Sequence, residues 1–254
     1  MSLTDKIALV TGGGSGLGRA TALEFARQGA RAIIVADLDG PKAAVVASEI
    51  ESLDGDCAAV AQRVDVTDPA SATLMVTDAV ARFGRLDCAV NNAGTTGGQG
   101  SVADYDLEEW DRVLRVNLTS VLLCLQAELP VMVDQGEGAI VNVASGAGRM
   151  GFPGLPAYVA SKHGVVGLTR VAALEYIGRG VRVNAVCPGS TRTPMLEAFM
   201  GGDEQVEKMM ARAAPIGRLG RPEEIAAAIV WLCSPAASFT VGQAISIDGG
   251  AVMQ

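Results

Sequence analysis

The stretch from Ile7 to Gly18 reads IALVTGGGSGLG, a short apolar run that passes directly into a glycine-rich turn. A buried strand followed by glycines and the start of a helix is typical of a phosphate site. The glycine backbone can approach an anion closely, and the helix N-terminus favours negative charge. The glycines are spaced GxxxGxG, at Gly12, Gly16 and Gly18. This spacing predicts a site for a dinucleotide pyrophosphate, with a tight strand-to-helix turn that binds no ligand as the alternative.

Apolar runs and segments of helical period alternate along the rest of the chain. Runs rich in Val, Ile and Ala that are separated by helices predict a parallel sheet covered on both faces. The expected strands are Ile7–Val10, Ala32–Ala36, Cys57–Arg63, Asp87–Asn91, Ala139–Val143, Arg182–Val186 and Ala244–Ile247. The expected helices are Gly16–Gln28, Pro41–Leu53, Pro69–Phe83, Leu107–Val133, Ala157–Ile177 and Pro222–Leu232. Right-handed crossovers then predict an α/β fold, a Rossmann-like doubly wound parallel sheet of about seven strands with helices on both faces.

The order of these elements predicts a single domain over residues 1–254, because no linker or repeat divides the chain. One interruption, at about 188–215, is too long for an ordinary connection between a strand and a helix. Segments of this kind often close over a bound substrate. We therefore expect a dinucleotide-binding and catalytic domain with a substrate lid.

Composition and charge argue against several classes of function. The formal net charge is -8 and no basic run occurs, so nucleic acid is not an expected partner. The apolar stretch Val121–Val133 is short and contains Glu128 and Pro130, so no membrane span is expected. A start without signal-peptide features and five scattered cysteines favour a cytoplasmic protein with reduced thiols and no metal site. Apolar residues make up 49% of the chain, which favours an oligomer.

Acidic and amide residues follow three of the expected strands. Asp37 ends the second strand, where a carboxylate can bind both ribose hydroxyls of an adenosine and repel a 2′-phosphate. This position favours NAD over NADP, although Arg19 would attract a 2′-phosphate. Asp65-Val66 follows the third strand, where Asp65 can accept from the adenine amino group, and Asn91–Gly94 follows the fourth. For both segments a helix cap or a turn is an equally good interpretation.

A second group of polar residues is compatible with proton transfer. Tyr158 and Lys162 are four residues apart in an expected helix, so their side chains share one face. A tyrosine titrates near pH ~10, and an ammonium together with a positive nicotinamide ring lowers that pKa. Ser145 ends the fifth strand, where its hydroxyl can bond a substrate oxygen or merely cap a turn. Asn117 lies among apolar residues, where its amide either holds a water that links Lys162 to solvent or is satisfied by backbone.

The ordered set of motifs resembles the classical short-chain dehydrogenases/reductases over essentially the whole chain. The set consists of GxxxGxG at 12–18, Asn91-Asn92-Ala93-Gly94, Asn117, Ser145, Tyr158-Val159-Ala160-Ser161-Lys162 and Pro188-Gly189. The resemblance implies a catalytic tetrad of Asn117, Ser145, Tyr158 and Lys162, in which Tyr158 exchanges the alcohol proton while hydride passes to or from the nicotinamide. It also implies a homotetramer, and nicotinamide contacts from Thr191 and Thr193. Family members usually carry an aliphatic residue where Thr191 stands, so its contact is expected through the backbone.

NAD is therefore the expected cofactor, bound along the carboxyl ends of the strands. The residues expected to contact it are Gly12, Ser15, Gly16, Leu17, Gly18, Asp37, Asp65, Val66, Asn92, Ala93, Gly94, Tyr158, Lys162, Pro188, Gly189, Thr191 and Thr193. The expected activity is the NAD-dependent interconversion of a secondary alcohol and a ketone.

Two other functions are alternatives to this activity. A serine hydrolase is disfavoured because no GxSxG turn occurs and the sole histidine, His163, adjoins Lys162, which places it on the helix surface or at an interface. A nucleotide-binding regulatory protein that uses the same fold without turnover is the remaining alternative.

The lid gives the only indication of the substrate, because its apolar residues favour a hydrophobic or cyclic alcohol or ketone. Those residues are Met195, Leu196, Phe199, Met200, Met209 and Met210, with Ala147 and Met150 beyond Ser145 as further lining. Packing of the lid onto the domain is an equally simple explanation of the same pattern. Arg149 and Arg192 are the cations that could turn inward to hold a carboxylate.

Overall fold

The computed structural model describes residues 3–53 and 55–253, and its centre is a seven-stranded sheet in the order β3-β2-β1-β4-β5-β6-β7. All neighbouring strands pair in parallel. The strands are β1 (Ile7–Thr11), β2 (Ala32–Asp37), β3 (Ala58–Arg63), β4 (Cys88–Asn91), β5 (Gly138–Val143), β6 (Val181–Pro188) and β7 (Ala244–Ile247). The strand order reverses between β1 and β4, which confirms the doubly wound fold. The predicted strands are confirmed, with ends that shift by one or two residues.

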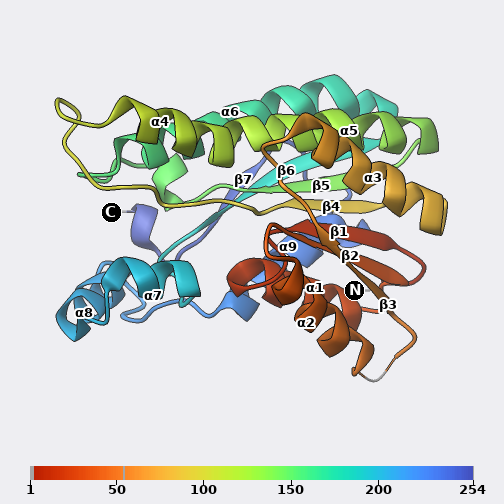
Figure 1. The fold of residues 1–254 in the computed structure, drawn as a ribbon, viewed down its shortest axis with the longest axis horizontal. Helices are drawn as coiled ribbons and strands as arrows, with labels where there is room; N and C mark the ends of the chain where they lie inside the picture. The colour runs from red at the N-terminus through yellow and green to blue at the C-terminus, as the bar shows by residue number, and fades with distance from the viewer. Residues whose placement is uncertain (1–2, 54, 254) are drawn as a thin grey trace.

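Helices cover both faces of the sheet (Figure 1). One face carries α1 (Gly16–Arg27), α2 (Gly40–Glu51) and α9 (Pro222–Cys233). The other carries α3 (Pro69–Phe83), α4 (Leu107–Leu114), α5 (Ser120–Gln135) and α6 (Pro156–Tyr176). Each layer packs its own core on the sheet: Phe25 and Ile33 lie in the first, and Leu125 and Ile140 in the second, all fully or almost fully buried. The two cores hold the carboxyl ends of the strands rigidly at one edge.

The prediction of one continuous helix over Leu107–Val133 is wrong in one respect, because a π-helical turn over Arg115–Thr119 interrupts it. The turn lies between α4 and α5 and contains Asn117, whose side chain is fully buried. A π turn inserts one extra residue into a helix and is frequent at functional sites. The segment Leu107–Gln135 is long and apolar enough to cross a membrane, but 44% of its most apolar window is buried inside the protein. It lies on the sheet in Figure 1 and packs as a core helix.

The segment expected to act as a lid contains two short helices, α7 (Pro194–Met200) and α8 (Glu204–Arg212). They stand apart from the layers that cover the sheet, beyond the carboxyl end of β6 (Figure 1). Arg192, just before α7, forms an ion pair with Glu207 on α8. Met200 is buried, whereas Met195 and Met209 are exposed, so the apolar residues of this segment do not all pack onto the domain.

Candidate active site

The residues expected to be functional lie where the strands end. The glycine turn follows β1, Asn92 follows β4, Ser145 follows β5 and Gly189 follows β6. These four strands include the neighbours β1 and β4, between which the strand order reverses. Ligands bind in open α/β sheets at this crevice. The architecture therefore brings the expected cofactor and catalytic residues to one edge.

The glycine turn is shaped so that larger residues would not fit. Gly12 and Gly16 have φ angles of 62° and 52°, which L-residues with side chains rarely adopt. A Cβ on Gly18 would overlap with the Gly12 carbonyl oxygen. The Asn92 amide fixes the turn by donating to the carbonyls of Thr11 and Gly12 at 2.9 and 3.2 Å. The result is a backbone cradle in front of α1, which fits a pyrophosphate.

The Asp37 carboxylate faces this cradle. One oxygen accepts from the Gly14 amide at 2.9 Å and the other from the Asp39 amide at 2.9 Å. The carboxylate is thus fixed at the end of β2, beside the glycine turn. Arg19 points to another partner, since its guanidinium forms an ion pair with Glu49 at 2.7 Å. The one cation that favoured a 2′-phosphate from the sequence is therefore already neutralised.

The segment after β3 has the conformation of a turn. One Asp65 oxygen accepts from both the amide and the hydroxyl of Thr67, at 2.9 and 2.7 Å, and these bonds lower the pKa of Asp65. Val66 is almost fully buried in the core. The turn-forming interpretation of Asp65 is therefore confirmed, while contacts with an adenine remain a prediction.

The four residues of the expected tetrad come together around the start of α6. Lys162 Nζ donates to the Val143 carbonyl at 2.9 Å and lies 5.7 Å from the centre of the Tyr158 ring. Ser145 Oγ accepts from the Ala147 amide at 3.1 Å, and the Ser145 side chain lowers the pKa of Tyr158. A Cβ on Gly94 would lie 3.2 Å from Asn117 Oδ1 and 3.6 Å from Lys162 Nζ. The structure thus joins four residues that span 46 positions of the chain, from 117 to 162.

The Asn117 amide is satisfied by protein atoms. It accepts from the Thr95 amide and donates to the Thr95 carbonyl, each at 2.8 Å, and it donates to Ser161 Oγ at 3.2 Å. Of the two alternatives from the sequence, the structure shows the amide held by backbone. The chain after Gly94 is thereby pinned to the π turn.

Burial dominates the electrostatics of the catalytic pair. It lowers the pKa of Lys162 from 10.5 to about 8. It also raises the pKa of Tyr158, and the hydrogen bond with Ser145 offsets this only in part. That Lys162 and the positive nicotinamide ring together lower the pKa of Tyr158 stays a prediction. The Lys162 ammonium donates to the Val143 carbonyl, and removal of the phenol from water raises the pKa of Tyr158.

The loop after β6 lies against the glycine turn. A Cβ on Gly16 would lie 3.4 Å from Thr193 Cβ, and Thr193 Oγ1 caps α7 by accepting from the Leu196 amide at 3.3 Å. Thr191 Oγ1 donates to the Gly189 carbonyl at 3.0 Å, and its backbone bridges to Gly220. A Cβ on Gly189 would lie 2.7 Å from Asp248 Cα, so this position requires glycine. The loop therefore closes the cofactor cradle from the side of the expected lid.

Comparison with known proteins agrees with this geometry. A family model described as enoyl-(acyl carrier protein) reductase matches residues 12–252. Cyclohexanol dehydrogenase of Acinetobacter sp. (strain SE19) is 43% identical over 245 residues, covering 96% of this chain and 94% of that protein. The chain belongs to the classical short-chain dehydrogenase/reductase family.

Two solved structures of this family are close to the fold. Levodione reductase has a TM-score of 0.96 and 38% identity, covering 99% of both chains. The 3-ketoacyl-(acyl-carrier-protein) reductase of Brucella melitensis, complexed with NADH, has a TM-score of 0.89 and 36% identity, covering 99% of this chain and 100% of that one. This short-chain dehydrogenase/reductase is accordingly an oxidoreductase that interconverts an alcohol and a ketone with a nicotinamide dinucleotide.

Both arginines considered for a substrate carboxylate of this short-chain dehydrogenase/reductase have other partners. Arg149 donates to the Ala244 carbonyl at 2.7 Å, and Arg192 pairs with Glu207. The sequence did not single out Thr95, whose only signal is its place directly after Gly94. His163 is exposed and its ring contacts the Val159 carbonyl, which confirms the surface position expected for it.

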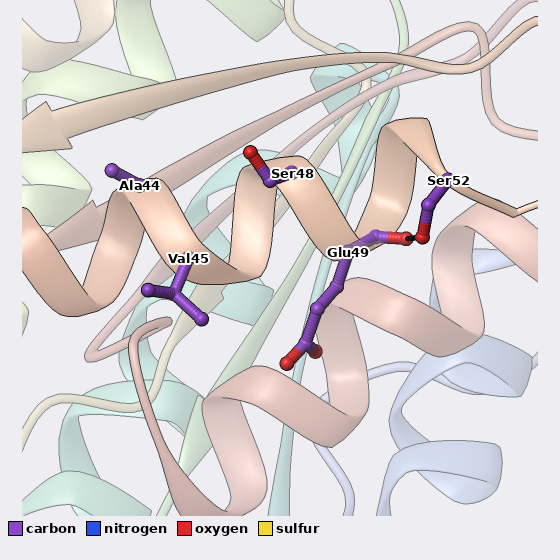
Figure 2. A pocket seen from close by; sticks show the side chains of 5 residues that line it. All are labelled: Ala44, Val45, Ser48, Glu49 and Ser52. Atoms are coloured by element: carbon purple, nitrogen blue, oxygen red, sulfur yellow. Dashed lines mark hydrogen bonds between the residues drawn. The ribbon is translucent and has the colours of Figure 1, made fainter.

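A hollow on the outer face of α2 has no part in this site. Figure 2 shows it lined by Ala44, Val45, Ser48, Glu49 and Ser52. A similar hollow lies on the outer face of α3. Both helices flank the sheet (Figure 1), and the residues that line the two hollows belong to α2 and α3. Within residues 3–53 and 55–253, no group of three acidic, histidine or cysteine side chains is placed to hold a metal ion.

Proposed function

We propose that this chain is an NAD-dependent dehydrogenase/reductase of uncharged cyclic secondary alcohols, with Tyr158 as the acid–base. The observation that carries the proposal is the cluster of Tyr158, Ser145 and Lys162 at the end of β5, in which Lys162 Nζ lies 5.7 Å from the tyrosine ring and Ser145 lowers the pKa of Tyr158. This arrangement places two hydroxyls side by side at the end of β5, where an alcohol oxygen can meet both. Cyclohexanol dehydrogenase and levodione reductase act on ring substrates by their names, which supports the same class for this chain.

The chemistry follows from the positions of these two hydroxyls. In oxidation, the phenolate form of Tyr158 accepts the alcohol proton and becomes the phenol, while the Ser145 hydroxyl donates to the substrate oxygen as it becomes a carbonyl. Bound NAD supplies the hydride acceptor, and NADH the donor in reduction. Lys162 provides positive charge at the end of β5, where its ammonium donates to the Val143 carbonyl. Asn117 fixes the loop after β4 by accepting from the Thr95 amide.

We propose that NAD is selected over NADP by Asp37. Its carboxylate is fixed by two backbone amides at the point where a ribose would lie, and it would repel a 2′-phosphate. Arg19 is paired with Glu49 and does not oppose it. The glycine cradle, Asn92 to Gly94, Lys162, and Pro188 to Thr193 would hold the remaining parts of the cofactor.

We propose that the substrate carries no carboxylate, because Arg149 and Arg192 are bound to Ala244 and Glu207. Exposed apolar side chains follow Ser145 and Thr193 closely in the chain: Met150, Phe152 and Met195 are 38%, 42% and 41% exposed. A neutral ring would bury part of this surface without leaving a charge unpaired.

The same reasoning extends to assembly and location. Leu174 and Phe239 are 81% and 103% exposed, an apolar surface that supports a homotetramer. A net charge of -8 and reduced cysteines support a cytoplasmic location, with neither nucleic acid nor membrane as a partner. The segment 188–215 would close over the bound substrate, with the Arg192–Glu207 pair joining its two ends.

The decisive experiment compares the wild-type chain with Tyr158→Phe. Oxidation of cyclohexanol and of 4-hydroxycyclohexanecarboxylate would be followed by the absorbance of NADH, and NADH binding by its fluorescence. We expect the neutral alcohol to be the better substrate, and Tyr158→Phe to abolish turnover while NADH still binds. Retention of most of the activity in the variant would refute the role of Tyr158. NADH binding without turnover of any alcohol by the wild type would instead favour a regulatory protein.

A further inference from the structure

The loop that follows the Asn91–Gly94 motif lies along one face of α4 and the π turn. Glu109, Val113 and Asn117 are spaced four residues apart, so their side chains project from successive turns of this helical segment on one face. Asn117 binds both backbone groups of Thr95, as described above. Val113 lies against Gly97, on which a Cβ would overlap with Val113 Cγ2. Glu109 accepts from the Gly98 amide at 2.6 Å. The loop and the helix thus meet in register over three contacts.

Glu109 is an unusual member of this series. It lies three residues after Asp106, which caps α4 by accepting from the Glu109 amide at 2.8 Å. A glutamate at this position commonly folds back onto the capping residue of its own helix. Here its carboxylate reaches the Gly98 amide, eleven residues earlier in the chain, instead. The side chain therefore binds the loop and not the capping residue of its own helix.

Two further contacts fix the Glu109 end of the loop. Arg112 binds both carboxylate oxygens of Glu109, at 2.6 and 2.7 Å, and together with the Gly98 amide it lowers the pKa of Glu109 to about 2. The Tyr105 hydroxyl donates to the Gly98 carbonyl at 2.9 Å. Both backbone groups of Gly98 are therefore held, as those of Thr95 are at the other end.

The segment held in this way borders the catalytic residues. Gly94, at its start, lies against Asn117 and Lys162, and the Gly100 amide donates to the Gly154 carbonyl at 3.0 Å. Gly154 precedes α6, which carries Tyr158. The cofactor motif is fixed separately, because Asn92 bonds to Thr11 and Gly12. A displacement of Gly98 would therefore disturb the loop beside the catalytic residues more than the glycine turn, which Asn92 holds.

We propose that Glu109 is a positioning residue for substrate binding, which holds the loop Thr95–Gly98 against α4 as a fixed wall beside Asn117 and Tyr158. The proposal rests on the proposed alcohol dehydrogenase activity. A loop freed at Gly98 must be ordered again when a ring substrate binds, and this ordering weakens binding without changing the proton transfer. The expected signature is a higher KM for the alcohol at nearly constant kcat and nearly constant KM for NAD.

The test uses Glu109→Ala, Glu109→Gln and the matched control Glu108→Ala in the full chain. Glu108 is exposed and is the other acidic residue in the first turn of α4, so it shares the helix-dipole effect but not the contact with Gly98. We expect Glu109→Ala to raise the KM for cyclohexanol about three- to tenfold, the range of one exposed charge-assisted hydrogen bond. Glu109→Gln retains an acceptor for the Gly98 amide and is expected to restore most of the wild-type KM, and Glu108→Ala all of it.

Hydrogen exchange of the loop, measured by mass spectrometry, gives a readout independent of activity. We expect peptides that contain Gly98 to exchange faster in Glu109→Ala than in Glu108→Ala. Equal exchange in the two variants would overturn the proposal that Glu109 holds the loop against α4. Faster exchange with an unchanged KM would overturn its role in substrate binding. A wild type that oxidises no cyclic alcohol would refute the proposed function, while the exchange experiment would still decide whether Glu109 holds the loop.

Discussion

Because Glu128 is buried, we expect the free energy of unfolding to depend measurably on pH. Its side chain is fully buried in α5, and one carboxyl oxygen accepts from Asn91 Nδ2 at 3.1 Å. Among the described residues, neither its other oxygen nor Asn91 Oδ1 has a hydrogen-bond partner. Burial raises the pKa of Glu128 from 4.5 to about 7, against the opposing effect of the Asn91 bond. A proton on Glu128 supplies a hydrogen-bond donor beside two acceptors that have no donor, Asn91 Oδ1 and the second oxygen of Glu128. The neutral acid is therefore more stable at this site than the carboxylate.

The raised pKa of Glu128 determines the size and the sign of the effect of pH on the free energy of unfolding. Between pH 4.5 and about 7 the folded chain retains a proton that the unfolded chain has lost. At about 1.4 kcal/mol for each pH unit, the full effect is about 3 kcal/mol. The stabilisation is complete below pH 4.5, declines as the pH rises, and is lost above about 7.

Glu128→Gln isolates this contribution, because glutamine keeps the shape and the donor but cannot ionise. Free energies of unfolding in urea would be measured for the wild type and the variant from pH 5 to 8. We expect the variant to gain up to about 3 kcal/mol relative to the wild type over this range. Other carboxylates affect the free energy of unfolding equally in the wild type and the variant, so their effects cancel in the difference. Glu175→Gln, at an exposed position on α6, serves as the matched control. A difference that stays constant with pH would show that Glu128 is charged throughout and would refute the reasoning.

Two further predictions concern the cofactor and the backbone. Asp37→Ser removes the charge that we propose selects NAD, so the ratio of kcat/KM with NADP to that with NAD should rise about tenfold or more; an unchanged ratio would contradict the assignment of NAD selection to Asp37. Gly180 has a φ of 85°, and a Cβ there would overlap with the Gly136 carbonyl oxygen, so Gly180→Ala should lower the free energy of unfolding by about 2 kcal/mol or more. Gly178→Ala, where a Cβ meets nothing within 4 Å, should have little effect in the same urea titration.

Elements with local signals at both ends could be predicted to the residue. The helix α3 begins at Pro69 after Asp68, which accepts from the amides of Ala70 and Ser71, and it ends before Gly84, with a φ of 80°. These residue types specify a helix start and a helix end by their own conformational preferences. The prediction of Pro69–Phe83 is confirmed for this reason.

The π turn could not be predicted in the same way. The apolar pattern runs through Arg115–Thr119 without interruption, so the sequence predicts a continuous helix. What distinguishes the turn in the structure is the bonding of Asn117 to Thr95, 22 residues earlier, and to Ser161, 44 residues later. Such contacts depend on the assembled fold and leave no local pattern. The position of Asn117 was predicted, but its partners were not.

The catalytic pair shows the same limit in its electrostatics. The spacing of Tyr158 and Lys162 correctly predicts that they share a helix face, but it says nothing of how much water surrounds them. In the structure burial acts on both groups, raising the pKa of the phenol and lowering that of the ammonium to about 8. Both shifts favour the neutral side chains. The Ser145 bond opposes this only partly, so the positive nicotinamide ring has to contribute much of the field that makes Tyr158 a useful base. The acid–base strength of Tyr158 is therefore expected to depend on the bound cofactor as well as on Lys162.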